Sequence, residues 1–489
     1  MTEENGTDER PLVLLRLAGE IAIKSKATRK NFVRRLRHNL RDALDSVGGS
    51  WELDDEWSRI FVRAESPDLP TVLPRVFGIS SVSPIDAEVP ARLDAIVAEG
   101  RRLYADLVRG RTYAVRARRS GTHPFASRDI EHALGAALNE AATVDLSNPE
   151  VTVLVEVRDA RALLFTRRIP GAGGLPLGVE GRALALISGG YDSAVAAWLL
   201  AKRGVELDYV FCNLGGDAYE RAVLQVAKVL ADDWSYGSRP RMHVVDFEAP
   251  LRELREKTQP RYWQVALKRL MYRAASRVAE ETGAEALITG EAMGQVSSQT
   301  LSNLRAIEPA ATLPVFRPLL GFDKEEIIER ARHIGTAALS ERVKEYCAIA
   351  PGRPVTAATV EAVDAQDRAM DPAIVEEAVA RRRVLDLRAL EPVDLVAPYL
   401  FTTEIPDDAV VLDCRSEAQY RAWHLPGAQH REEWELLKSY RALDKAPTYV
   451  LYCMHGIQSA HLAEKMQRHG YEAYSFRGGV AGLRAWAGG

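Results

Sequence analysis

Apolar residues change their spacing several times along the chain, and these changes divide it into successive segments. In the first segment the pattern predicts a strand, an amphipathic basic helix, a return strand and a second helix, over 11–17, 28–47, 60–64 and 69–76. This order and size indicate a small α+β unit of the split βαβ type.

A second unit has a pattern of its own. It predicts two helices, over 93–107 and 127–142, and three strands, over 112–118, 151–157 and 162–169, with a turn at Asp159. Residues 171–181 then contain five glycines and Pro176, a composition typical of a linker.

From residue 182 short apolar runs alternate with helical patterns. The predicted strands cover 183–187, 207–213, 241–246 and 286–289, and the predicted helices cover 192–203, 217–231, 261–282 and 325–334. Such alternation favours a doubly wound parallel sheet, which binds ligands outside the carboxyl ends of its strands.

The C-terminal part of the chain predicts two further pieces. Residues 357–387, rich in Ala, Glu, Asp and Arg, indicate a helical connector. A last α/β unit begins near Val393, with strands expected over 410–413 and 449–452.

Composition is that of an ordinary multidomain globular protein. The 489 residues are too many for one core, and 47% are apolar and 27% charged. No apolar run is long enough to span a bilayer, and the polar first residues do not resemble a signal peptide. The four cysteines are scattered without a C-x-x-C pair, which argues against a zinc site and a secreted disulfide scaffold. We therefore expect a cytoplasmic protein without a membrane partner.

Charge is unevenly distributed, although the net charge is only −4. Residues 16–41 hold nine Lys or Arg against one Glu, a net charge of +8, and residues 101–128 hold eight Arg against one Asp, a net charge of +7. Each block alone is explained by a solvated helix face. Two blocks in one third of the chain favour a polyanionic partner.

The sequence Ser188-Gly-Gly-Tyr-Asp-Ser193 stands between a predicted strand and a predicted helix. Glycines let the backbone approach an anion, and the helix N-terminus directs free N–H groups at it. The spacing is not that of Walker A. The hexapeptide resembles the PP-loop of ATP pyrophosphatases, which implies phosphate contacts from Ser188, Gly189, Gly190, Asp192 and Ser193. The alternative is a tight turn with Ser188 or Asp192 as the helix cap.

Three more motifs follow in order: Thr289–Leu304, which is dense in small and amide residues, Arg317–Lys324, and Glu345-Tyr-Cys347. Together with the PP-loop they resemble the tRNA 4-thiouridine synthetase (tRNA sulfurtransferase, ThiI) family, over essentially the whole chain. The resemblance implies ATP contacts from Leu186, Ile187, Lys268, Gly290 and Gln299. Taken alone, Lys268 would be interpreted as a surface residue. Asp192 is expected to position phosphate or a Mg²⁺ ion held mainly by ATP.

The two N-terminal units resemble the ferredoxin-like and THUMP pair of RNA-modifying enzymes. Ile21-Ala-Ile-Lys-Ser-Lys26 and Val115-Arg-Ala-Arg-Arg-Ser-Gly-Thr-His123 carry this resemblance. It implies shape recognition of folded RNA through phosphate contacts. The candidate contacts are Lys24, Lys26, Arg29, Lys30, Arg116, Arg118, Arg119 and Arg128.

Cys453 ends an apolar strand and opens the loop Cys-Met-His-Gly-Ile-Gln-Ser459 before a helix expected over 460–469. Loop N–H groups and a helix N-terminus would stabilise its thiolate and make it a nucleophile. The loop resembles a rhodanese active site, as do Asp413–Ser416, His424–Ala428 and Gly478–Val480, which implies a persulfide on Cys453. Gln458 replaces a frequent Arg there, and His455 is interpreted as a solvent-exposed loop residue. The alternative for Cys453 is a buried, inert thiol.

Of the other cysteines, Cys212 and Cys414 are expected in cores. Cys347 is ambiguous from its surroundings, with burial an equal alternative. The family resemblance implies that Cys347 forms a redox disulfide with Cys453 as sulfur leaves.

By resemblance, then, the chain would adenylate O4 of a tRNA uridine, at position 8, and replace that oxygen with sulfur from the Cys453 persulfide. Its partners would be tRNA, a cysteine desulfurase, a thiol reductant and the sulfur carrier protein of thiamine synthesis, and a homodimer is conceivable. Two alternatives stay open: a sulfur-relay protein for thiamine synthesis with little tRNA activity, and a non-catalytic tRNA-binding module.

The expected domains follow from both lines of argument. They are a ferredoxin-like domain (1–75), a THUMP domain (76–170), a linker (171–182), a PP-loop domain (183–356), a helical connector (357–392) and a rhodanese-like domain (393–489).

Overall fold

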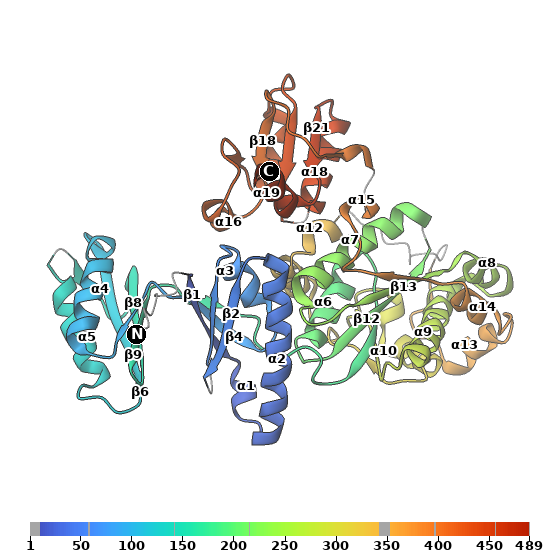
Figure 1. Ribbon diagram of the computed structural model, residues 1–489. Coiled ribbons are helices and arrows are strands. Elements are labelled where there is room, and N and C mark those ends of the chain that lie inside the picture. The colour runs from blue at the N-terminus through green and yellow to red at the C-terminus, as the bar shows by residue number, and fades with distance from the viewer. Residues whose placement is uncertain are drawn as a thin grey trace, which may run out of the picture. The chain divides into compact units, whose positions relative to one another are not determined.

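The computed structural model describes residues 10–488 except 57–58, 141, 215, 342–352, 396–397 and 455; within elements, the side chains of residues 55–56, 216–218, 398, 434, 437–438, 457–458 and 461 are also not described. The chain forms two compact units, one of residues up to 29 together with 43–174, the other of residues 30–42 together with 175 onward. Figure 1 shows the four sheets that these units contain. Among the described helices none is long and apolar enough to cross a membrane.

The first sheet of the N-terminal unit is antiparallel, in the order β10-β4-β1-β3-β2. Its elements are β1 (Leu12–Leu17), α1 (Gly19–Ala22), α2 (Lys26–Val47), β2 (Trp51–Glu56), β3 (Arg59–Ala64), α3 (Leu69–Val72), a 3₁₀ turn (Leu73–Arg75), β4 (Ile79–Pro84) and β10 (Ile169–Pro170). The predicted helix over 69–76 is split because Pro74 cannot donate the hydrogen bond that would continue α3.

The second sheet has the order β5-β9-β8-β6-β7 and packs against two helices. Its elements are β5 (Ala87–Pro90), α4 (Leu93–Val108), β6 (Thr112–Ser120), α5 (Ser127–Leu138), β7 (Thr143–Val144), β8 (Val151–Arg158) and β9 (Arg161–Phe165). Asp159 has φ of 46° in the β8–β9 turn, where the sequence predicts it. Two predicted ends are wrong: α5 stops at Leu138, and the strand expected over 162–169 stops at Phe165.

The third sheet belongs to the second unit and has the order β15-β14-β11-β12-β13-β16. Its strands are β11 (Arg182–Leu186), β12 (Glu206–Asn213), β13 (Arg241–Asp246), β14 (Leu287–Ile288), β15 (Val315–Phe316) and β16 (Arg383–Asp386). All neighbours are parallel except β16, which runs antiparallel to β13. From β11 the chain builds outward through β12 and β13 and then returns to β14 on the other side of β11. This reversal of strand order makes the carboxyl ends of β11 and β14 the expected ligand position.

Helices cover both faces of this sheet. Their bounds are α6 (Tyr191–Ala201), α7 (Gly216–Trp234), α8 (Glu248–Lys257), α9 (Trp263–Thr282), α10 (Leu301–Ile307), α11 (Lys324–Ile334), α12 (Ala337–Ser340), α13 (Val360–Asp367) and α14 (Ile374–Ala380), with 3₁₀ turns at Pro260–Tyr262, Ser297–Gln299 and Glu308–Ala310. α9 packs with α8 and α14 against Leu184 and Val210, whereas α6 packs with α7 and α11. The predicted connector over 357–387 is therefore only partly helical, because its last residues form β16.

The segment expected to be a linker, 171–182, contains neither helix nor strand apart from Arg182, the first residue of β11, but it is not a free connection. Leu175 and Leu177 are buried. The carbonyl of Leu177 accepts hydrogen bonds from Arg35 Nε at 2.7 Å and from Asn39 Nδ2 at 3.1 Å. Part of the first basic block is thus used inside the fold, since Arg35 also pairs with Glu206 at 3.5 Å.

The fourth sheet is parallel, in the order β17-β21-β20-β18-β19. Its elements are α15 (Pro392–Leu395), a 3₁₀ turn (Pro398–Leu400), β17 (Phe401–Thr402), β18 (Val410–Asp413), α16 (Glu417–Ala422), β19 (Gln429–His430), α17 (Glu433–Ser439), a 3₁₀ turn (Tyr440–Ala442), β20 (Tyr449–Tyr452), α18 (Ile457–Arg468), β21 (Ala473–Phe476) and α19 (Gly479–Gly488). Apolar clusters cover both of its faces. The predicted strands over 410–413 and 449–452 are confirmed.

Candidate functional site

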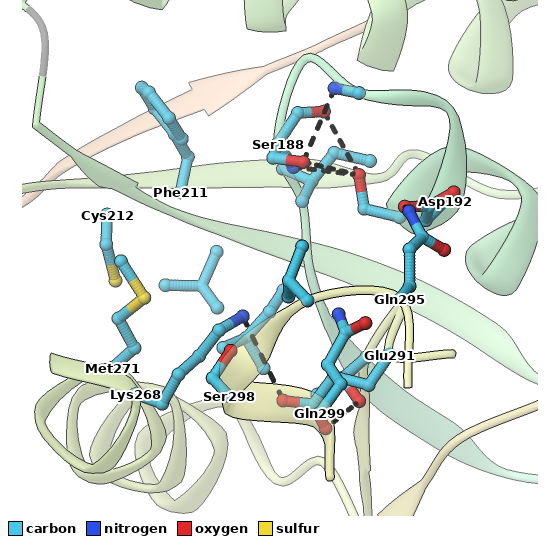
Figure 2. Close-up of a pocket in the computed structure, with 18 of the residues that line it drawn as sticks. Ser188, Asp192, Phe211, Cys212, Lys268, Met271, Glu291, Gln295, Ser298 and Gln299 are labelled. Atoms are coloured by element: carbon cyan, nitrogen blue, oxygen red, sulfur yellow. Dashed lines mark hydrogen bonds and ion pairs between the residues drawn. The ribbon is translucent and has the colours of Figure 1, made fainter. Parts of the chain in front are cut away.

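The loop between β11 and α6 is closed by its own serines (Figure 2). Ser193 Oγ accepts a hydrogen bond from Ser188 N at 2.9 Å, lies 3.0 Å from Ser188 Oγ and donates to Ser188 O at 3.1 Å. Gly190 N donates to Ser188 Oγ at 3.4 Å. Helix α6 has Gly190 as its N-cap and no side-chain cap. The alternative of a turn capped by Ser188 or Asp192 is therefore wrong, and the serines instead fix the shape of the loop.

Gly290, two residues after β14, packs against the first turn of α6, where this loop ends, without space for a side chain. A Cβ atom at Gly290 would lie 2.5 Å from Ser193 N and 2.6 Å from the carbonyl carbon of Asp192. Real Cβ atoms do not approach backbone so closely. The two loops at the reversal of strand order are thus held together by backbone contact, which only glycine allows.

Asp192 lies in the first turn of α6 and is bound on both oxygens. Its Oδ1 pairs with Lys324 Nζ at 2.8 Å, and its Oδ2 accepts from Gln295 Nε2 at 2.8 Å. Lys324 opens α11 and Gln295 belongs to the loop after β14. Asp192 therefore joins three separate segments at the rim of the site.

A buried carboxylate, Glu291, organises the floor of the site. Its side chain is 2% exposed and accepts from Tyr272 Oη at 2.6 Å and Arg317 Nε at 2.8 Å. Lys268 Nζ lies 3.9 Å from Glu291 Oε1, as the dashed line in Figure 2 marks. Burial alone would raise the pKa of the Glu291 carboxyl, but Lys268, Tyr272 and Arg317 outweigh burial and hold that pKa below its ordinary value.

The same network acts on Tyr272. Burial, and then the neighbouring Glu291 charge, raise the pKa of the Tyr272 hydroxyl well above its ordinary value. Tyr272 therefore remains a neutral hydrogen-bond donor to Glu291. Lys268 is a pocket residue in this structure, so its interpretation from the sequence alone as a surface residue is wrong.

An open pocket connects these groups, and the empty space in it, counted out into open solvent, is about 1150 Å³. Its lining is Leu186, Ile187, Ser188, Gly190, Asp192, Ser193, Val210, Phe211, Cys212, Tyr219, Gln264, Lys268, Met271, Thr289, Gly290, Glu291, Gln295, Val296, Ser298 and Gln299. The structure thus brings together every predicted nucleotide contact except Gly189. One wall is apolar and the other presents N–H, amide and ammonium groups, as a site for an aromatic base with an anionic tail requires. Among the described residues, the buried Gln299 Oε1 has no hydrogen-bond partner.

Cys453 follows β20 and is 2% exposed. Its Sγ accepts from Gly456 N at 3.2 Å and from Ser459 Oγ at 3.3 Å, and Ser459 also hydrogen-bonds Ser475 Oγ at 2.8 Å. Burial agrees with the alternative of a structural thiol. Two donors aimed at the sulfur do not, because they stabilise negative charge on it.

Comparison with known proteins adds four matching family models. They are the ThiI ferredoxin-like domain over 12–83, the THUMP domain over 90–167, the thiamine biosynthesis protein (ThiI) over 178–371 and the rhodanese-like domain over 401–485. A tRNA sulfurtransferase of Pyrobaculum aerophilum is 40% identical over 474 residues, 95% of this chain and 96% of the relative. One of Proteus mirabilis is 36% identical over 471 residues, 94% of this chain and 98% of the relative. The chain belongs to the tRNA sulfurtransferase family.

A solved structure agrees with this family. The crystal structure of a 4-thiouridine synthetase–RNA complex with bound ATP is 32% identical, with a TM-score of 0.67, and the match covers 77% of this chain and 99% of that one. As a tRNA sulfurtransferase family member, the chain is a sulfurtransferase enzyme. The predicted fold classes, ferredoxin-like, THUMP, PP-loop and rhodanese-like, are confirmed.

The predicted RNA contacts of this family member lie on its surface. Lys24, Lys26 and Lys30 are exposed near the start of α2, and Arg29 is half-buried. Arg116, Arg118 and Arg119 are exposed along β6, and Arg128 is exposed in the first turn of α5. The first set lies at or just before the start of α2, and the second lies on β6 and the first turn of α5, so each set offers several cations for phosphate contacts.

Cys347 and His455 lie outside the described residues, as does the side chain of Gln458 within α18. Cys212 and Cys414 are buried as predicted, but Cys212 also lines the pocket.

Sequence reasoning missed Glu291, Gln295 and Lys324, although the motifs at 289–304 and 317–324 contain them. The motifs identify the segments that contain these residues, but only the folded structure shows which side chains they bind.

Proposed function

We propose that this enzyme is a tRNA uridine 4-sulfurtransferase that activates O4 of a uridine with ATP and then replaces that oxygen with sulfur. The observation that carries the proposal is the phosphate-type loop beside an open pocket, in a chain that also holds a hydrogen-bonded cysteine on a second parallel sheet. The solved relative bound to both RNA and ATP supports both substrates.

The pocket suits the adenylation half of the reaction. Leu186, Phe211 and Met271 offer an apolar wall to adenine, while the N–H groups of the loop and Lys268 would hold phosphates. Uridine O4 would attack the α-phosphorus, forming an O–P bond as the bond to pyrophosphate breaks. Asp192 is held by Lys324 and Gln295 beside the loop, and these groups together would keep the departing pyrophosphate in place.

Magnesium would be held mainly by phosphate oxygens. Asp192 is a single carboxylate already paired with Lys324. The described part of the chain contains no group of three His, Cys, Asp or Glu side chains arranged for a metal ion. When bound, the cation would neutralise phosphate charge, and Asp192 would be the residue that helps to position it.

Cys453 would supply the sulfur. A cysteine desulfurase would load it as a persulfide, whose terminal sulfur forms a bond to C4 of the activated uridine as AMP leaves. Attack of the Cys347 thiol on Cys453 Sγ would break the sulfur–sulfur bond and leave a disulfide between Cys347 and Cys453. A cellular thiol must then reduce this disulfide before the next turnover.

The deciding assay combines the full chain with unmodified tRNA, ATP, cysteine and a cysteine desulfurase. We expect 4-thiouridine, at position 8 by family resemblance, together with one pyrophosphate and one AMP for each sulfur transferred. Mass spectrometry of the digested nucleosides measures the product. Omission of ATP is the control, and an absence of product with the complete mixture would refute the proposal.

The basic N-terminal surface would hold the tRNA. Replacing Arg116, Arg118 and Arg119 with Gln should weaken tRNA binding and lower the slope of log affinity against log salt by about 1 for each lost phosphate contact. A filter-binding titration at several salt concentrations measures this slope. An unchanged slope would remove β6 from the RNA surface. The same titration with the chain at varied concentration tests whether two copies share one tRNA.

A second function rests on the description of the matching family model, a thiamine biosynthesis protein. In this role the Cys453 persulfide would pass sulfur to a thiocarboxylate carrier protein. The fourth sheet has its own cores on both faces, so residues 390–489 can be tested separately. Restoration of thiamine synthesis by this fragment, combined with no thiouridine from the full chain, would favour the sulfur-relay alternative.

A further inference from the structure

Cys414 lies beside Cys453 on the neighbouring strand. In the parallel pairing of β18 and β20, Asp413 is opposite Tyr452, and the residues that follow them are Cys414 and Cys453. The pairing continues to this point, because Cys414 N donates to Tyr452 O at 2.9 Å. Neighbouring strands lie about 4.8 Å apart, within the range of about 4.4–6.8 Å between the Cα atoms of a disulfide.

Both side chains also lie on the same face of the sheet. Leu412, Cys414, Leu451 and Cys453 belong to the apolar cluster that includes residues of α17 and α18. The alternate residues Val411, Val450 and Tyr452 belong to the cluster on the other face. Cys414 and Cys453 are 4% and 2% exposed, so each thiol is placed to form a disulfide with the other inside this core.

We propose that Cys414 is a second resolving thiol, which attacks Cys453 Sγ when that sulfur carries a persulfide and no acceptor is present. The inference rests on the proposed role of Cys453. In the proposed function the sulfur passes to an acceptor. Here the sulfur is not transferred, and the step takes place within the rhodanese-like domain, without Cys347.

The step balances without another reactant. A bond forms between Cys414 Sγ and Cys453 Sγ, and the bond from Cys453 Sγ to the terminal sulfur breaks. The terminal sulfur takes the electron pair and the thiol proton and leaves as hydrosulfide. The Cys414 sulfur is oxidised to the disulfide level, and the terminal sulfur is reduced to sulfide.

The environment of Cys414 slows this step. Burial, and then the charge on Cys453, raise the pKa of the Cys414 thiol well above its ordinary value. Its Sγ also lies 3.8 Å from the Leu412 carbonyl, which accepts the thiol proton. A thiol held protonated attacks slowly, so a persulfide survives long enough to meet an acceptor.

The test uses the full chain with Cys347→Ser, so that Cys347 cannot act as the partner of Cys453. Cysteine and a cysteine desulfurase load the protein without tRNA or ATP, and samples are alkylated over time and digested with trypsin without reduction. Cleavage after Lys and Arg places Cys414 in the fragment 389–415 and Cys453 in the fragment 446–465. Mass spectrometry then follows the persulfide and any link between the two fragments, and a sulfide probe follows release.

We expect the Cys453 persulfide to decay into the 389–415 to 446–465 link, with one sulfide released for each link. Adding Cys414→Val, which fills the same buried space, should prolong the persulfide and abolish the link, whereas Cys212→Ser should change neither. Decay at the same rate with Cys414→Val, or without any link, would overturn the inference while leaving the persulfide role intact.

A second arm separates this failure from failure of the proposed function. Diamide oxidises neighbouring thiols directly and needs no persulfide. If Cys453 never carries the additional sulfur, the proposed function and the release step both fall, and a diamide-induced link would still identify Cys414 and Cys453 as a redox pair. If diamide gives no link either, the pairing itself is refuted.

Discussion

Two loops of this enzyme share a local design and differ in what they surround. Each follows a strand whose neighbours are parallel, leads into a helix and is closed by a serine on that helix: Ser193 binds back to Ser188, and Ser459 binds back to Cys453. The first loop borders a wide pocket with Lys268 in it. The second surrounds one sulfur atom that is 2% exposed.

The difference lies in what the serine hydrogen bonds. In the first loop the serine holds backbone, which leaves other N–H groups free for a large anion. In the second, the hydroxyl of Ser459 and the N–H of Gly456 both point at Cys453 Sγ, which suits the sulfur carrier proposed above. One arrangement of strand, loop and helix would thus serve both of the roles proposed above, anion binding and activation of a nucleophile.

The largest expected effect comes from the atom at the centre of the second loop. Cys453→Ser should abolish repeated formation of 4-thiouridine, because a hydroxyl cannot carry a persulfide, while ATP binding stays unchanged. Multiple-turnover assays and calorimetric titration with ATP measure the two properties. Full turnover by Cys453→Ser would show that the second loop is not the sulfur site.

The buried ion network beneath the first loop should give the next largest effect. Glu291→Gln leaves Lys268 and Arg317 without their buried counter-charge, and we expect a local loss of about 3 kcal/mol. Hydrogen exchange of the α9 and β14 amides measures it. Glu308→Gln is the matched control, because Glu308 binds the same Arg317 but is 49% exposed, and it should cost less than about 1 kcal/mol. Equal protection in both variants would contradict the role of Glu291.

The same carboxylate predicts a dependence on pH. Its folded-state pKa lies below the ordinary value of 4.5, so its contribution to stability is complete above that value and is lost as pH falls through the lower folded-state pKa. Protection of α9 should therefore fall below about pH 4.5 in the wild type and less steeply in Glu291→Gln. Identical pH profiles would exclude Glu291 as the titrating group.

Gly290→Ala tests the contact between the two loops of the pocket. The added Cβ must displace Ser193 or Asp192, and overpacking of about 1–3 kcal/mol corresponds to roughly 5–150-fold weaker ATP binding. Gly321→Ala is the control, since a Cβ there has nothing within 4 Å. Unchanged ATP affinity in Gly290→Ala would mean that the loop adapts.

Ser459→Ala should give the smallest effect and sharpens the comparison most directly. Loss of one hydroxyl donor to Cys453 Sγ should slow alkylation of Cys453 by several-fold, at about 1 kcal/mol for one hydrogen bond. Ser475→Ala removes the partner of that hydroxyl but no donor to sulfur, and should slow the reaction less. A larger effect from Ser475→Ala than from Ser459→Ala would show that the Ser459 hydroxyl is not what activates Cys453.

The sequence predicted elements best where local pattern decides them. Strands such as 241–246 and the Ser188–Ser193 loop depend on neighbours in sequence, and they were found. Trp51–Glu56 forms β2 although four of its six residues are Asp or Glu, and the last three of these are consecutive, so that no apolar alternation continues along the strand. β16 was missed for a similar reason, because it has only two apolar residues, which lie between Arg383 and Asp386.

The site shows the same limit over longer distances. Lys268 became a candidate only through the family resemblance, because its helix presents other cations as well. The pairing of Asp192 with Lys324 spans 132 residues, and that of Glu291 with Arg317 spans 26. Such pairs depend on strand order, which periodicity does not give.

Strand β16 has a practical consequence for dissecting the enzyme. The matching family model ends at residue 371, but the sheet does not end there, since β16 pairs along the edge of β13 over Arg383–Asp386. Truncation at 371 would leave the backbone groups of β13 open to another chain and remove α14 from the core, which invites aggregation. A nucleotide-domain fragment that ends after Leu387 keeps this edge covered and should remain monomeric where the shorter one does not.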